Sequence, residues 1–343
     1  MKKNFLLVLL AATVALAGFS QDKKEIAALE KEYGAFTSHK KFYDKKEWAM
    51  CKFTIVYKLT TAMTAKDMDK NDEVGAKVKS SSGAYGMLEG ITESDLQAIT
   101  DKVAKNFIER VKNEAGVNIS TWSQFKDSKN TEKIIESQEE RELYSKSQGL
   151  AFAMSYDGTP NYNRVIIFVP GGKKLAKEID KNVMEFTIYI DFADVLAEAN
   201  ADVNITARTE TATTIRTYYT WKEGGNQKLV PGVRIVRNIG SESLGEMGMN
   251  LSTTKIGGHD DLGYMFYMGL GAELVSDVNF VEKIVEDEDK VPDILANRKN
   301  NKIEYAKTFN VVTTPAKYEA AVMDVTNKYF DAFLKIYKFN VAK

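Results

Sequence analysis

The stretch that decides the fold runs Met184-Glu185-Phe186-Thr187-Ile188-Tyr189-Ile190-Asp191-Phe192. Phe186, Ile188, Ile190 and Phe192 alternate with the more polar side chains between them. A period of two is that of a β-strand, whose successive side chains point to opposite faces of the sheet. We therefore expect a strand with one face on a core and the other in water, the pattern typical of antiparallel sheets.

The residues that follow extend the same pattern. Residues 203–221 alternate over a long Thr- and Tyr-rich run, Gly224-Gly225-Asn226 predicts a turn, and residues 233–239 and 249–256 are further candidate strands. At the end of the chain, Thr314 precedes Pro315, and large apolar side chains then recur at helical spacing to about residue 338. The second half is predicted to be strand-rich and closed by a helix.

The first half carries one strong helix signal. Thr92 and Asp95 stand where a helix is capped, apolar residues then recur every three or four positions, and Gly116 predicts the C-terminal stop. Before it we expect a strand over residues 52–59 and a polar loop over 65–82. After it we expect a strand over 117–125, a helix over 131–147 and a strand over 164–169.

These elements predict an α+β protein: a helix-on-sheet unit over residues 21–170, then a strand-rich, largely antiparallel part over 171–343 with a C-terminal packing helix. The predicted boundary lies near Pro170-Gly171-Gly172. The chain contains only five prolines, and no Pro-rich linker marks it more sharply.

The N-terminus has the three parts of a secretory signal peptide. Lys2 and Lys3 are followed by a short apolar run and then by small residues, with cleavage expected after Ser20 or Ala17. The run is shorter than the roughly 20 apolar residues that a membrane-spanning helix needs, so the mature chain is expected to have no integral membrane segment. We therefore expect export to the periplasm or the extracellular space.

Composition narrows the functional classes. Lys and Arg number 47 against 48 Asp and Glu, which gives no overall attraction to nucleic acid. The single cysteine, Cys51, excludes an internal disulfide and is expected to be a small buried hydrophobic residue. No catalytic or metal-binding motif and no cofactor fingerprint occurs, so we assign no catalytic residue, no metal and no cofactor.

Two weak candidate sites remain. Gly171, Gly172 and Lys173 follow a predicted strand and open a predicted helix, so their backbone amides could hold an anion, or form only a turn. Tyr218, Tyr219 and Trp221 could form an aromatic ligand platform, or pack. We interpret Asp67, Asp69 and Asn71 as a solvated loop because the glycine and glutamate of a calcium loop are missing, and Gly257-Gly258-His259 as a turn.

One resemblance adds to these patterns. Strand 52–57, the polar loop, helix 92–115 and strand 117–122, which contains Val117-Asn118-Ile119-Ser120-Thr121-Trp122, resemble the opening unit of the curli-secretion lipoprotein family and the TolB N-terminal domain, over residues 50–170. The resemblance implies a helix lying across a mixed sheet and a role in envelope assembly or interaction. The lipidated cysteine of the secretion lipoprotein is missing here, and no functional residue is carried over.

The first hypothesis is therefore an exported, non-enzymatic envelope protein that binds other envelope proteins. The alternative is a secreted small-ligand binder or enzyme that uses the C-terminal sheet. A lesser alternative is an outer-membrane barrel, which draws on the alternating strands, although residues 209–217 carry polar side chains in both registers.

Overall fold

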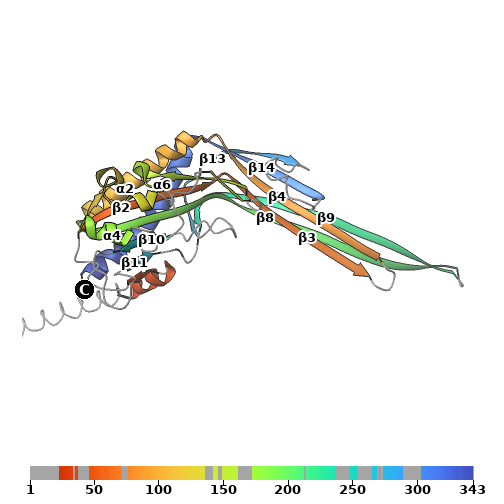
Figure 1. The fold of residues 1–343 in the computed structure, drawn as a ribbon. Coiled ribbons are helices and arrows are strands. Elements are labelled where there is room, and N and C mark those ends of the chain that lie inside the picture. Colours follow the sequence, from red (N-terminus) through yellow and green to blue (C-terminus); the bar gives the residue numbers. More distant parts are fainter. Residues whose placement is uncertain are drawn as a thin grey trace, which may run out of the picture.

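The computed structural model describes residues 23–33, 35–37, 46–71, 76–135, 142–145, 149–160, 172–211, 214–236, 248–252, 265–268, 270, 273–288 and 303–342. The predicted signal peptide lies outside these residues. Helices and mixed sheets confirm the α+β class. Figure 1 shows two parts, a head in which helices cover a sheet, and an arm in which long strands run away from the head.

The head is organised around one strand, β8 (Asn182–Thr211), whose first third lies at the centre of the sheet. β2 (Glu47–Lys58) pairs with it in parallel from Asn182 to Ile190, and β10 (Gly248–Ser252) pairs antiparallel on its other side. Further strands extend the sheet outward from these: β7 (Gly149–Ser155), β6 (Glu142–Ser145), β5 (Asn118–Ser120), β11 (Met265–Met268) and β1 (Phe36–Thr37). Residues from both sides of Pro170 thus form neighbouring strands of one sheet.

Two helices cover one face of this sheet. α2 (Glu93–Ala115) confirms both of its predicted ends, since it begins at a capping box formed by Thr92 and Asp95 and ends at Gly116, which has φ 65°. α6 (Pro315–Val341) confirms its predicted start at Thr314, whose hydroxyl accepts the N–H of Lys317, but it continues past residue 338 to Val341. The two helices pack together over β2, as Figure 1 shows.

Four phenylalanines join the helices to the sheet. Phe53 of β2 stacks on Phe186 of β8 with ring centroids 4.9 Å apart. Phe107 of α2 lies 5.6 Å from Phe186 and 4.9 Å from Phe330 of α6. All four are fully buried, and each such ring contributes about 2–3 kcal/mol by burial alone. They fix the head core at the crossing of both helices and both strands.

A smaller hydrophobic cluster covers the other face of the head sheet, near the start of β2 and β8. Cys51 of β2 packs there among short helices, and its burial confirms the expected role. The water-facing side predicted for residues 184–192 is wrong, because Glu185, Tyr189 and Asp191 are all buried. This second layer comes mainly from η2 (Trp122–Gln124), α3 (Glu132–Ile135) and α4 (Gly172–Glu178).

The arm consists of two layers of strands. One layer is the distal part of β8 with β9 (Thr214–Val236), which pair antiparallel from Tyr189↔Val236 to Thr211↔Thr214. β12 (Leu274–Val275) adds to β9 near the head. The second layer is a four-stranded sheet with the order β13 (Val281–Glu288), β14 (Tyr305–Thr313), β4 (Ala76–Glu89), β3 (Thr60–Asn71). β3 and β4 pack on β8, and β4 also packs on β9.

The arm overturns two predictions. The expected polar loop over residues 65–82 is instead most of the β3–β4 hairpin. The expected turn at Gly224-Gly225-Asn226 lies inside β9, opposite Glu198 to Asn200 of β8.

Two predictions in the head are wrong in extent. The strand predicted over residues 117–125 is only β5, followed by η2. The helix predicted over residues 131–147 is only the four residues of α3, and β6 lies later in that range. Residues 164–169 lie outside the described residues.

Small and polar side chains let the two layers of the arm approach closely. Ser80 donates a hydrogen bond to the carbonyl of Gly224 at 2.7 Å, and Gln227 donates to the hydroxyl of Ser82 at 2.7 Å. A Cβ at Gly225 would lie 2.9 Å from the Cβ of Ser82. Since β8 has 30 residues and a strand rises about 3.3 Å per residue, β8 spans on the order of 100 Å.

The close contact between the layers predicts different effects for two adjacent glycines. Gly225→Ala pushes a methyl group into Ser82 and is expected to lower the free energy of unfolding by about 1–3 kcal/mol. Gly224→Ala is the matched control because no atom lies within 4 Å of its Cβ position, and it is expected to change stability by no more than about 0.5 kcal/mol. Urea unfolding measures both, and equal effects would contradict the packing of β9 on β4.

Candidate functional site: the junction between head and arm

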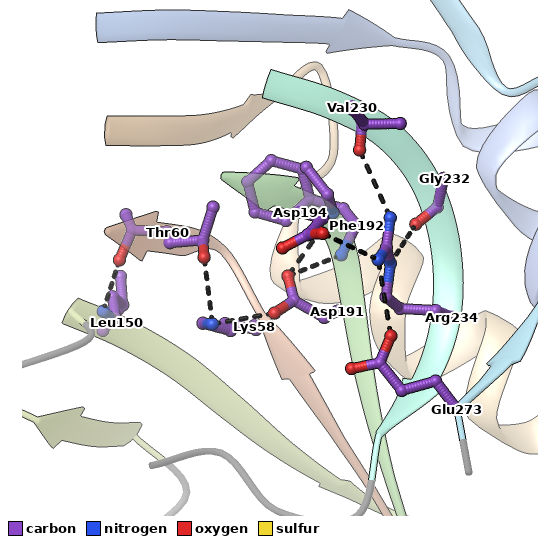
Figure 2. Close-up of polar contacts among 12 residues, drawn as sticks. Lys58, Thr60, Leu150, Asp191, Phe192, Asp194, Val230, Gly232, Arg234 and Glu273 are labelled. Atoms are coloured by element: carbon purple, nitrogen blue, oxygen red, sulfur yellow. Dashed lines mark hydrogen bonds and ion pairs between the residues drawn. The ribbon is translucent and has the colours of Figure 1, made fainter. Parts of the chain in front are cut away.

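The junction is the place where the chain passes from head to arm. β2 ends at Lys58, and after Leu59 the chain enters the second sheet as β3. Beside it β8 continues through a register shift between Asp191 and Ala193 in its pairing with β9. Such a bulge bends a strand and increases its twist. Figure 2 shows the polar side chains that gather at this point.

A buried ion pair lies at the centre of the junction. Lys58 Nζ donates to Asp191 Oδ2 at 2.7 Å and to Thr61 Oγ1 at 3.0 Å. The other carboxylate oxygen of Asp191 accepts the backbone N–H groups of Phe192 at 2.8 Å and Ala193 at 3.4 Å. About a tenth of each charged side chain is exposed. Because both oxygens have partners, Asp191 holds the bulged backbone as well as the lysine.

Arg234 of β9 lies directly opposite Asp191 and fixes the other strand. Its guanidinium donates to the carbonyls of Gly232 and Val230, both at 3.3 Å, so it binds the bend of its own strand. The same group lies 3.4 Å from Glu273 and 3.9 Å from Asp194 (Figure 2). An always-charged planar group with several donors suits this multiple attachment.

Backbone contacts attach further strands to the bend between β2 and β3. The N–H of Leu150 in β7 donates to Thr60 Oγ1 at 2.8 Å, and its carbonyl accepts the N–H of Leu59 at 2.9 Å. The carbonyl of Leu59 in turn accepts the N–H of Leu88 in β4 at 2.9 Å. The bend thus connects both sheets without leaving the backbone groups of Leu59 unpaired.

Two buried tyrosines lie beneath the junction. Tyr57 hydrogen-bonds with the hydroxyl of Thr100 on α2 at 3.0 Å, and Tyr318 of α6 lies beside it with ring centroids 6.3 Å apart. Within the described residues, the hydroxyl of Tyr318 has no hydrogen-bond partner. Burial, together with nearby Tyr57 and Asp191, raises its pKa well above the ordinary value. It therefore stays a neutral phenol.

The junction has the chemistry of a structural clamp. Its lysine, arginine and aspartates bind one another or the backbone, which leaves their geometry fixed by the fold. In the part of the chain that the structure describes, no group of three His, Cys, Asp or Glu side chains is placed to hold a metal ion. Burial also raises the pKa of the Cys51 thiol, which keeps it protonated and unreactive.

The predicted site residues lie elsewhere. Gly171 lies outside the described residues, and Gly172 and Lys173 open α4, so the anion site stays a prediction. Tyr218, Tyr219 and Trp221 lie in β9 far out on the arm, where their backbones pair with Thr206, Ile205 and Val203, and the ligand platform also stays a prediction. The structure does not bring these two sets together with the junction.

Two further sequence patterns are interpreted as a solvated loop and as a turn. Asp67 and Asp69 lie in strand β3 instead of a loop, and Asp67 accepts the backbone N–H of Ala201 in β8 at 2.8 Å. His259 lies outside the described residues. Sequence patterns do not predict a role for Lys58, Asp191 or Arg234. The one signal for them is the single aspartate within the apolar alternation of residues 184–192.

The chain matches no family model, no curated protein and no solved structure. The resemblance to curli-secretion and TolB proteins therefore stays a prediction. Among the described residues, no helix has both the length and the apolar character needed to span a bilayer.

The ion pair at the centre of the junction predicts a large effect of removing one partner. Lys58→Met leaves Asp191 buried without its cation and is expected to lower the free energy of unfolding by about 3–5 kcal/mol. Lys102→Met is the control because Lys102 pairs with Glu319 at the surface, where such a pair is worth at most about 1 kcal/mol. Chemical denaturation compares the two, and equal losses would show that the junction pair is no stronger than a surface pair.

The two tyrosines predict effects of opposite sign. Tyr318→Phe removes a buried hydroxyl that has no partner among the described residues, so the free energy of unfolding is expected to stay the same or to rise by up to about 1 kcal/mol. Tyr57→Phe removes the hydrogen bond to Thr100 and is expected to cost about 1 kcal/mol. Thermal unfolding of the pair measures the difference, and a clear loss in Tyr318→Phe would reveal a bound water or another partner at that hydroxyl.

Proposed function

We propose that this chain is an exported, non-enzymatic protein of the cell envelope that binds other envelope proteins, and that the arm is the binding element. The observation that carries the proposal is the shape in Figure 1, a head with a filled core and a long arm of paired strands that projects from it. The extension adds a large exposed sheet surface at a distance from the core.

Export is supported by the sequence of the first 20 residues and by the use of cysteine. The N-terminus has the charged, apolar and small-residue segments of a signal peptide. The only thiol is fully buried, so it is protected from oxidation in an oxidising compartment. Both features suit a protein that works outside the cytoplasm.

A binding role, as opposed to catalysis, is supported by the way the buried charges are used. Lys58, Asp191 and Arg234 are the buried charged groups closest to the arm, and their hydrogen bonds hold its base in place. A fixed base makes the arm a rigid extension, which reduces the conformational entropy lost when a partner binds. Exposed apolar side chains along it, Leu196 and Val230 among them, offer contacts.

The test is site-specific photo-crosslinking in the native host. A photo-reactive amino acid at Leu196 on the arm is expected to capture defined envelope proteins, whereas the same group at Ile135 in the head is the matched control, since the exposed fractions are 42% and 46%. Adducts are identified by mass spectrometry after purification. Recovery of only a small molecule, or adducts from the head position alone, would overturn the proposal.

A further inference from the structure

The distal part of the β3–β4 hairpin carries a basic patch on its outer face. Lys66, Met68 and Lys70 alternate along β3, and Lys77 and Lys79 lie opposite Lys70 and Met68 on β4. The inner face of the same hairpin is different, since Val78 and Ser80 are buried against the other layer. We call the five outward residues the basic face.

The basic face concentrates like charge at an energetic cost. Lys70 and Lys77 are direct cross-strand neighbours, an arrangement that destabilises a sheet. The charge of Lys79, with that of Lys70, lowers the pKa of Lys77. Within the described residues, no carboxylate pairs with Lys70, Lys77 or Lys79. Lys70, Lys77 and Lys79 are exposed, so their charges can meet an external anionic group.

The outer face of β8, in the opposite layer of the arm, carries the same pattern with the opposite sign. Asp194, Leu196 and Glu198 alternate there and are exposed, while Ala193, Val195 and Ala197 between them are buried. Val230 of β9 lies beside Asp194 and adds exposed apolar surface. We call Asp194, Leu196, Glu198 and Val230 the acidic face. Two basic groups lie near it: Lys228 is opposite Leu196, and the guanidinium of Arg234 lies 3.9 Å from Asp194.

The two faces match in spacing as well as in charge. Each has a charged, an apolar and a charged side chain at alternate positions of one strand, Lys66-Met68-Lys70 against Asp194-Leu196-Glu198. The charged residues are thus four positions, or about 13 Å, apart on both. Met68 and Leu196 at the centres are 47% and 42% exposed. One face laid on the other would bring opposite charges and the two apolar side chains together.

We propose that the arms of two copies of this chain associate, with the basic face of one copy on the acidic face of the next. The two faces lie on opposite layers of the same arm, so a single chain cannot satisfy both itself. Contact between different faces is heterologous and does not close after two copies, so association continues into larger species. The faces are small, and association is therefore weak and concentration-dependent. The acidic face shares Leu196 and Val230 with the surface proposed to bind other envelope proteins, so a second copy would compete with those partners there.

The experiment measures the mass of the full exported chain by light scattering over a concentration series, at about 0.02 M and about 0.5 M salt. Wild type is expected to form growing oligomers at low salt that dissociate at high salt. Lys70→Glu with Lys79→Glu disables the basic face, and it relieves the repulsion around Lys77, so folding is not expected to suffer. Leu196→Lys with Glu198→Lys disables the acidic face.

Each double variant is expected to weaken association on the order of tenfold or more. Mixed together, they are expected to associate again, since each retains one working face. Lys105→Glu with Lys112→Glu is the control, because it makes the same charge change on the exposed side of α2 and is expected to behave as wild type.

Three results would overturn the inference: a monomer at all concentrations, oligomers that neither salt nor the arm variants dissociate, or two arm variants that stay monomeric when mixed. Vesicles of phosphatidylglycerol and phosphatidylcholine test the competing occupant. If the basic face binds vesicles while the chain stays monomeric, an anionic bilayer and not a second copy is its partner. Because each readout uses purified chain, failure here leaves the crosslinking test of partner binding unaffected.

Discussion

The structure depends on a single constraint, that β8 is one continuous strand with two different surroundings. In the head it is covered on both faces, by the phenylalanines and helices α2 and α6 on one side and by shorter elements on the other. In the first part of the arm only one face of β8 is covered, and alternate side chains from Asp194 to Asp202 are exposed. The buried pair of Lys58 and Asp191 lies where one environment ends and the next begins. The bulge at Asp191 permits the bend, and the pair holds it in one geometry.

The arm has a different kind of core from the head. Burial of large aromatic rings stabilises the head, whereas serine, glycine, alanine and glutamine fill much of the space between the layers of the arm. Small side chains bury little apolar area, so hydrogen bonds between the layers and the long antiparallel ladder of β8 and β9 hold the arm together. Charged side chains are exposed on both outer faces of the arm, Lys70 and Lys79 on one and Asp194 and Glu198 on the other. The proposed roles in binding use the same exposed surface.

Local signals predicted the two long helices well, and the strands and the helix over residues 131–147 less well. The capping residues Thr92, Asp95 and Gly116 act within a few residues of themselves, so the sequence predicts the ends of α2 closely. Glycines 224 and 225 predict a turn by the same local logic, yet Gly225 is needed because Ser82, far away in sequence, lies against it. Residues 65–82 are polar enough for a loop, and only their pairing with each other and packing on β8 make them a hairpin.

The same reasoning explains why the junction could not be predicted. Asp191 was assigned to a water-facing side because charged residues seldom lie in a core, and its partner Lys58 is 133 positions away. The continuity of β8 also has a mechanical consequence. A pull on the far end of the arm acts along the axis of β8, and β2 is a parallel neighbour that it contacts over nine residue pairs. Such a force loads those hydrogen bonds in shear, all at once, instead of opening them one by one. The pairing of β2 with β8 therefore lets the head resist a pull on the arm.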